Sequence, residues 1–186
     1  MNLEDIEVLL GEARKLISHS EYVVIGSLSV IGMMTRTGAR APDRMLMSND
    51  LDCYPLRDPG RAFELEGKLG FGSEFERRHG YYLDPVSPDL PTLPDGWRDR
   101  MVRVDLDNGV VIMCLDPNDA AVSKYARSEP RDREWIRAGI AASILSLATI
   151  RYRFSMVVFL DLVEQEGARA HLAEDEAWWE QKAGRA

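Results

Sequence analysis

Two aspartates one residue apart, Asp50 and Asp52, lie in the mainly apolar stretch DLDCYP. Because side chains alternate between the two faces of a strand, both carboxylates would project from one face, with Cα atoms about 6.6 Å apart. Like charges at that spacing repel each other and resist losing water unless a cation lies between them. Magnesium prefers carboxylate oxygens and keeps room for water and phosphate groups. The pair therefore indicates a divalent-metal site, with a solvated strand end as the alternative.

A Gly-Ser pair, Gly26 and Ser27, lies upstream of the aspartates, at the end of the apolar run EYVVIG. Glycine permits a tight strand-to-helix turn and lets a ligand approach the backbone closely. The Ser27 hydroxyl and the amides at the start of a following helix would favour phosphate oxygens. A plain structural turn is the alternative for these two residues taken alone.

Apolar periodicity and turn residues predict the elements that must position these groups. The first part of the chain is expected to form, in order, a helix over 3–17, a strand over 21–26, a helix from 27, a polar loop over 35–44, a strand over 50–54, a helix over 59–69 capped by Asp58, a short helix or turn over 73–79 and a strand over 80–86. A hairpin around Asn108-Gly109 follows, with strands over 101–106 and 110–115, and then helices over 118–127, 131–149, 156–165 and 168–181. This order predicts an α/β (α+β) fold, with a small mixed β-sheet flanked by helices and a helical C-terminal part.

Composition narrows the class of protein. The 186 residues predict a compact α/β core over 1–116 with a helical subdomain over 117–186 packed on it. A formal net charge of −8 argues against a broad, non-specific grip on nucleic acid. Cys53 and Cys114 are too few for a disulfide framework or a zinc site, and as buried thiols they fit a reducing cytoplasm. The apolar run over 138–150 is too short to span a bilayer, so no membrane association is expected.

Together, these residues resemble the nucleotidyltransferase superfamily, which has the fold of DNA polymerase beta. The pattern of that superfamily is an apolar strand, Gly-Gly or Gly-Ser, a spacer, then Asp-x-Asp or Asp-x-Glu, with a third acidic residue on a later strand. The resemblance covers about residues 20–115. The stretch CLDPNDAAVSKYARSEPRDREWI is also similar to small bacterial members, including the abortive-infection and toxin-type branch. Its matching positions are Leu115, Pro117, Asp119, Lys124 and Asp132.

The resemblance implies a role for each matching residue. Asp50 and Asp52 would bind magnesium, with two ions expected. The turn at Gly26 and Ser27 would hold the triphosphate of a nucleoside triphosphate, which Lys124 would reach as a point charge.

The third carboxylate has two candidates. Asp84, in YYLDPV, lies on the next strand in chain order and is our choice as the third catalytic and metal-binding residue. Asp105, in MVRVDL, is the alternative, although it shares a strand face with Arg103 and could pair with it in solvent. Arg127 could extend a basic patch near Lys124, but we interpret it as part of a solvated helix face, with Asp132 among its local partners.

The implied function is metal-dependent transfer of a nucleotidyl group from a nucleoside triphosphate to a hydroxyl acceptor in the cytoplasm. The acceptor could be a protein side chain, an RNA end or a small molecule. The alternative is a catalytically inactive binding module of the same fold, one component of a toxin–antitoxin-like pair. Its acidic surface and the helix that carries Trp178 and Trp179 would then contact a protein partner. We favour the enzyme.

Overall fold

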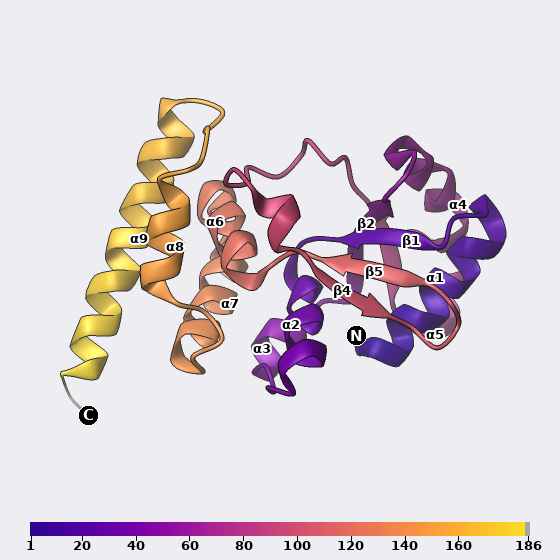
Figure 1. Cartoon of the computed structure of the whole chain (residues 1–186), viewed down its shortest axis with the longest axis horizontal. Coiled ribbons are helices and arrows are strands. Elements are labelled where there is room, and N and C mark those ends of the chain that lie inside the picture. The colour runs from indigo at the N-terminus through magenta and orange to yellow at the C-terminus, as the bar shows by residue number, and fades with distance from the viewer. Residues whose placement is uncertain (185–186) are drawn as a thin grey trace.

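The computed structural model describes residues 1–184, which form a five-stranded sheet beside a stack of C-terminal helices (Figure 1). The strands are β1 (Glu21–Val24), β2 (Asp50–Pro55), β3 (Tyr82–Pro85), β4 (Val102–Asp105) and β5 (Val111–Cys114). Their order is β3-β2-β1-β5-β4. β1 is antiparallel to β2 and parallel to β5, while β2–β3 is parallel and β4–β5 antiparallel. The predicted α/β class and small mixed sheet are therefore confirmed.

The N-terminal part of the chain contributes helices that lie around the sheet. They are α1 (Leu3–Ile17), α2 (Val30–Thr37), α3 (Asp43–Leu46), α4 (Glu66–Leu69) and α5 (Glu74–His79), with 3₁₀ turns η1 (Ser27–Ser29), η2 (Pro59–Leu65) and η3 (Trp97–Arg100). Asn2 and Asp5 form a capping box at the start of α1, which satisfies orphan amides there. The buried face of α1 packs on the sheet and includes Ile6, Leu10 and Ile17.

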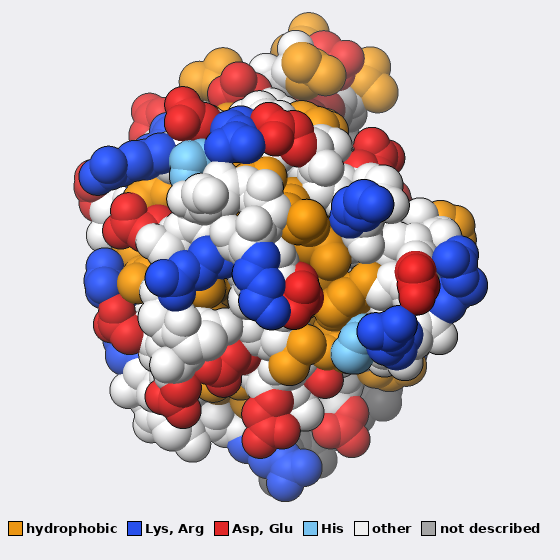
Figure 2. Space-filling view, turned by 90° about the vertical axis from the view of Figure 1, so that its right-hand side faces the viewer, with side chains coloured by type: hydrophobic (Ala, Val, Ile, Leu, Met, Phe, Trp, Pro, Cys, Tyr) orange, Lys and Arg blue, Asp and Glu red, His pale blue; other side chains and the backbone are white. Residues whose placement is uncertain are grey.

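A groove lies on the outer surface formed by α1, α4 and α5. Val8, Leu16, Leu69 and Phe75 contribute to its lining, together with the His79 ring. Figure 2, which looks at this end of the molecule, shows hydrophobic side chains gathered in a band between charged ones. The groove lies on the side of the sheet domain away from the C-terminal helices.

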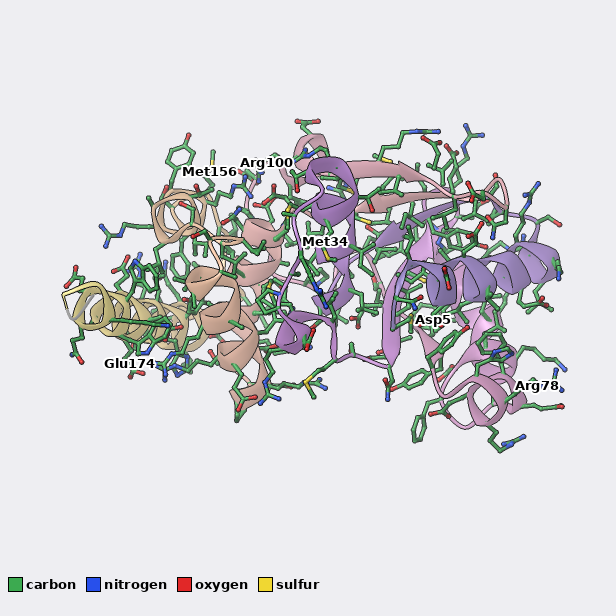
Figure 3. All side chains as sticks on the ribbon, turned by 90° about the horizontal axis from the view of Figure 1, so that it is seen from below. Asp5, Met34, Arg78, Arg100, Met156 and Glu174 are labelled. Carbon is green, nitrogen blue, oxygen red and sulfur yellow. The ribbon has the colours of Figure 1, made fainter. Side chains whose placement is uncertain are left out.

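The C-terminal helices are α6 (Pro117–Arg127), α7 (Pro130–Ala141), α8 (Leu147–Phe154) and α9 (Leu162–Ala183). Their buried side chains form one hydrophobic cluster with residues from the end of the sheet, including Ile25 and Leu115. An ion pair adds to this junction, because Arg100 of η3 donates to the fully buried Asp119 of α6 at 2.9 and 3.2 Å. Figure 3 shows Arg100 at the boundary between the sheet and these helices.

Two helix predictions are wrong in this part. The helix expected over 131–149 ends at Ala141, because Ser143 takes a left-handed φ of 59° and the chain folds back. Gly139 permits this turn, since a Cβ there would lie 2.7 Å from the Leu145 side chain. The helix expected over 156–165 is absent from the described chain over 156–161, where Val157 forms an antiparallel bridge with Pro94 instead.

Smaller differences have local causes. Helix α9 begins only at Leu162, because Asp161 caps it by accepting from the Glu164 amide at 2.8 Å. Asp58 precedes the helical segment over 59–69 but has a left-handed φ of 53°, so its side chain makes no capping hydrogen bond within the described residues. No helix within residues 1–184 combines the length and hydropathy needed to cross a bilayer.

Candidate active site

Three carboxylates converge where β2 and β3 run side by side. Asp50 and Asp52 project from β2, and the parallel register places Asp84 of β3 directly opposite Asp52. One oxygen from each of the three lies within 4.8 Å of the others. The Ser48 hydroxyl donates to Asp50 and helps to fix its orientation. Hard oxygen ligands at this spacing fit a divalent cation such as magnesium.

The turn after β1 brings the backbone against this cluster. Gly26 has φ 67° and ψ −155°, a region that is essentially restricted to glycine. A Cβ on Gly26 would overlap the Asp52 carboxylate. The Ile25 amide donates to the Asp52 carbonyl at 2.9 Å, and the Ser29 hydroxyl donates to the Gly26 carbonyl at 2.8 Å. Glycine is therefore required by both the backbone conformation and the closeness of the carboxylate.

A buried ionic network faces the turn from the C-terminal helices. Lys124 of α6 donates to the Ser27 hydroxyl at 3.0 Å and to Asp132 of α7 at 2.9 Å. Arg127 donates to both oxygens of Asp132, at 2.8 and 2.6 Å. Lys124 and Asp132 are almost completely buried. Asp132 therefore holds two cations beside the turn, and Lys124 is pinned in place rather than free to sample solvent.

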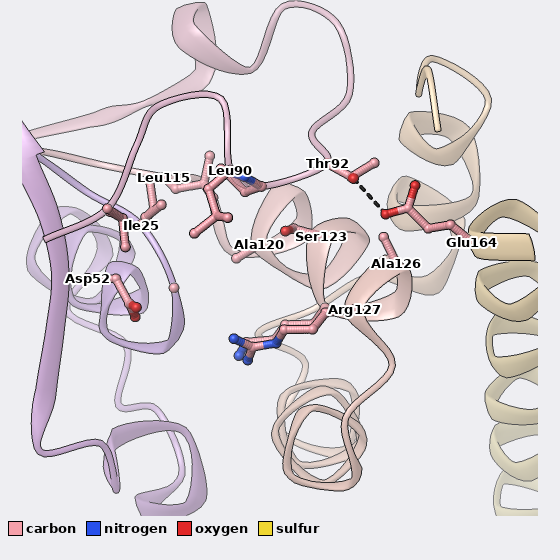
Figure 4. Close-up of a pocket in the computed structure, with 14 residues that line it drawn as sticks. Ile25, Asp52, Leu90, Thr92, Leu115, Ala120, Ser123, Ala126, Arg127 and Glu164 are labelled. Atoms are coloured by element: carbon pink, nitrogen blue, oxygen red, sulfur yellow. Dashed lines mark hydrogen bonds between the residues drawn. The ribbon is translucent and has the colours of Figure 1, made fainter. Parts of the chain in front are cut away.

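Two cavities meet at Asp52 and share Lys124 and Arg127. The smaller, of about 170 Å³, is polar and is lined by residues that include Ser27, Arg44, Asp50 and Arg131. The larger, of about 310 Å³, runs from Asp52 past apolar side chains to Glu164 (Figure 4). Asp52 thus lies between a more polar space and a mainly apolar one.

The family comparison agrees with this geometry. Residues 4–183 match the sequence model of a family described as nucleotidyltransferase of unknown function (DUF6036). The chain belongs to this nucleotidyltransferase family. The match confirms the superfamily expected from the Gly-Ser and Asp-x-Asp motifs, while the abortive-infection and toxin-type branch stays a prediction. No curated protein and no solved structure matches the chain significantly.

The electrostatics of the three clustered carboxylates favour a bound cation. Burial, together with the charges of Asp50 and Asp84, raises the pKa of Asp52 to about 7. Burial and Asp50 also raise the pKa of Asp84. A bound divalent cation would neutralise this repulsion, so the donor set fits a metal in its charge as well as in its oxygen ligands.

In the buried ionic network, opposing effects act on the pKa values of Asp132 and Lys124. Burial would by itself raise the pKa of Asp132, but hydrogen bonds from Arg127 and the charge of Lys124 lower it below its usual value. Burial lowers the pKa of Lys124, against the opposing effect of Asp132. Asp132 is therefore held as a carboxylate, which is the state that fixes Lys124 and Arg127 by hydrogen bonds.

The structure separates the two candidates for the third carboxylate. Asp84 lies with Asp50 and Asp52, whereas Asp105 lies on β4, at the opposite edge of the sheet from β3. Asp105 is exposed and accepts from Arg103 at 2.6 Å, as expected for a solvated strand face.

Sequence reasoning gave Arg127 and Asp132 no role in the site, although Asp132 was among the positions that match the small bacterial members. It took Arg127 as part of a solvated helix face with Asp132 as a local partner, whereas Asp132 is 1% exposed and accepts from Arg127 in the buried network. The spacing of Lys124 and Arg127 on one helix face was the available signal, because side chains three apart are neighbours on a helix. The resemblance brought Lys124 toward the Gly-Ser turn, but the local pattern did not show that Arg127 lies on the same side.

Proposed function

We propose that the protein is a magnesium-dependent nucleotidyltransferase that moves a nucleotidyl group from a nucleoside triphosphate to a hydroxyl acceptor. The observation that carries this proposal is the register of β2 and β3, which brings Asp84 to Asp50 and Asp52. In this proposal residues 1–116 supply the carboxylates, and residues 117–186 supply Lys124 and Arg127 beside them. We place the reaction in the cytoplasm, in keeping with the free, buried Cys53 and Cys114.

The triphosphate would bind on the cationic side of Asp52. The Ser27 hydroxyl and the Lys124 ammonium, which are 3.0 Å apart, both line the smaller cavity there. Arg127 lines the same cavity and can hydrogen-bond phosphate oxygens in addition to Asp132. Asp132 positions Lys124 and Arg127 and does not itself need to touch the substrate.

Asp50, Asp52 and Asp84 would hold two magnesium ions. When bound, these ions supply charge that stabilises the attacking and leaving oxygens of the transfer. The acceptor oxygen forms a bond to the α-phosphorus, and the bond from that phosphorus to the oxygen bridging to the β-phosphate breaks, so pyrophosphate leaves. Asp84 orients the acceptor hydroxyl by accepting its hydrogen bond and takes its proton.

Thermal unfolding tests whether the site takes nucleotide. With magnesium and a nucleoside triphosphate at a hundred times its Kd, the free energy of unfolding should rise by about 2.7 kcal/mol. Pyrophosphate should accumulate in the same samples when an acceptor is added. Stabilisation without pyrophosphate or labelled product, across all four nucleotides and all acceptor classes, would favour the inactive binding module instead.

Replacing Lys124 by methionine should weaken nucleoside triphosphate binding about tenfold to a hundredfold. A hydrogen bond to a charged group contributes roughly 1.5–3 kcal/mol, and Asp132 would keep Arg127 as a partner. Calorimetric titration of each triphosphate, with magnesium present, measures the change. Lys15→Met, on the exposed face of α1, is the matched control and should bind nucleotide as the wild type does. Equal affinities in the two variants would remove Lys124 from the proposed site.

A further inference from the structure

The larger cavity opens at a surface formed by two segments, residues 86–95 and 156–166, which we call the rim. Large apolar side chains of the rim project into solvent instead of packing. Leu90, Val158, Leu160, Leu162 and Val163 are 71–87% exposed. Apolar side chains gathered in this way on a soluble surface mark a site of contact with another macromolecule.

Hydrogen bonds join the two segments of the rim. The Thr92 hydroxyl donates to Glu164 at 2.8 Å, and the Asp95 amide donates to the Met156 carbonyl at 3.0 Å. The second Glu164 oxygen accepts from the Leu160 amide at 2.6 Å. The apolar side chains are therefore presented on an ordered support, which lowers the entropy cost of docking a partner.

The rim continues into the candidate active site. Leu90, Thr92 and Glu164 belong to the rim and also line the larger cavity, whose other end is Asp52. Figure 4 shows Leu90 over the cavity, with Asp52 on one side and Glu164 on the other. A molecule docked on the rim could therefore extend a side chain along the cavity to Asp52.

The negative charge of the rim argues against nucleic acid as the docked partner. Residues 86–95 and 156–166 contain five acidic residues and no lysine or arginine, the acids being Asp89, Asp95, Asp161, Glu164 and Glu166. A phosphate backbone would be repelled here, because nucleic-acid binding depends on lysine and arginine near the phosphates. The smaller cavity, in contrast, is lined by Arg44 and Arg131 in addition to Lys124 and Arg127, which both cavities share. Basic side chains next to apolar ones would complement the rim.

We propose that the acceptor is a protein whose apolar and basic segment docks on the rim and extends a serine, threonine or tyrosine hydroxyl along the larger cavity. This inference rests on the proposed nucleotidyl transfer and names its acceptor class. The side-chain oxygen becomes bonded to the α-phosphorus, the hydroxyl proton passes to the enzyme, and pyrophosphate leaves. The product is a protein that carries a nucleoside monophosphate in phosphodiester linkage.

The test compares three acceptor pools under the same conditions. The first is a pool of peptides with a central serine, threonine or tyrosine flanked by leucine, lysine and arginine. The second replaces lysine and arginine by aspartate and glutamate, and the third is single-stranded RNA with a free 3′ hydroxyl. Each pool is incubated with the full chain, magnesium and α-phosphate-labelled nucleoside triphosphates. We expect label in the basic peptides and little or none in the other pools.

Rim variants show whether the rim directs the transfer. Leu160→Ser combined with Val163→Ser, which removes apolar contact without adding charge, should lower kcat/KM for the basic peptides at least about tenfold. Phe71→Ser, which changes a residue that is 79% exposed and lies outside the rim, should leave it unchanged. Stabilisation by nucleotide should be the same in all three proteins, because none of the changed residues lines the smaller cavity.

Several outcomes would overturn the inference. Label in RNA alone, equal label in acidic and basic peptides, or labelling that is insensitive to the rim variants would each exclude a protein acceptor docked on the rim. The same holds if no peptide is labelled while nucleotide still stabilises the protein. If nucleotide does not stabilise the wild-type protein, that result would instead refute the proposed function itself.

Discussion

Asp52→Asn is expected to stabilise the metal-free protein at pH 8 and to remove its stabilisation by magnesium. In the folded protein the pKa of Asp52 is raised from 3.8 to about 7, which corresponds to at most about 4 kcal/mol at about 1.4 kcal/mol per pKa unit. Because the carboxylate keeps some contact with water, we expect a gain of about 2 kcal/mol. Urea unfolding with and without magnesium measures both effects.

The raised pKa of Asp52 also predicts how the stability difference between the two proteins changes with pH. A carboxyl group whose folded pKa is raised favours the folded state at low pH, and that contribution is lost as pH rises toward the folded pKa. The advantage of Asp52→Asn should therefore shrink as pH falls from 8 to 5, where the wild-type carboxyl is protonated in the folded protein. Asp105→Asn, at an exposed carboxylate on the far edge of the sheet, is the control and should neither stabilise the protein nor change its response to magnesium. Destabilisation by Asp52→Asn at pH 8 would contradict the electrostatic account.

Gly26→Ala is expected to reduce activity at least about tenfold and to destabilise the protein by about 2 kcal/mol. Its backbone angles, φ 67° and ψ −155°, cost a residue with a Cβ roughly 1–3 kcal/mol. The new Cβ would also overlap the Asp52 carboxylate, so that Asp52 must leave its place opposite Asp84. A small displacement of a catalytic group lowers rates strongly, because catalysis depends on alignment.

Gly38→Ala separates backbone strain from the effect on the site. Gly38 also has a positive φ, 71°, but a Cβ there meets no described atom within 4 Å. We expect this variant to lose about 1 kcal/mol of stability, as alanine does at a left-handed position, and to keep full activity. The comparison uses urea unfolding together with the rate of label transfer. Full activity in Gly26→Ala would show that the turn does not need to approach Asp52 closely.

The sequence predicted the local parts of this site better than the long-range ones. The Gly-Ser turn and Asp-x-Asp pair could be recognised because each lies within one short stretch with its own strand or turn pattern. Asp84 was chosen over Asp105 on chain order and on the possible pairing of Asp105 with Arg103, because local pattern does not show which strand lies next to β2. The structure places β3 there and β4 at the opposite edge, which brings Asp84 to the pair.

The failures among the C-terminal helices have a similar origin. Apolar periodicity continued through residues 142–146, so it predicted one helix where Ser143 and the space beside Gly139 allow a reversal. Residues 156–161 also looked helical, although they pair with the loop at Pro94 and Asp95. Tertiary contacts decided both segments, since helix propensity is a weak preference that such contacts override. Residues 156–161 form part of the rim, which explains why the sequence did not indicate this surface.

The most direct test of the central claim is transfer of α-phosphate label from each of the four ribonucleoside triphosphates, with magnesium, into total protein and total RNA. The wild type is compared with Asp52→Asn, which preserves side-chain shape and removes the charge, and with Asp105→Asn as the control. We predict label with the wild type and with Asp105→Asn, and at least a hundredfold less with Asp52→Asn, since even outer partners of metal ligands contribute about 10–100-fold. No label from any nucleotide, or equal label from Asp52→Asn, would contradict a metal-dependent transferase centred on Asp50, Asp52 and Asp84.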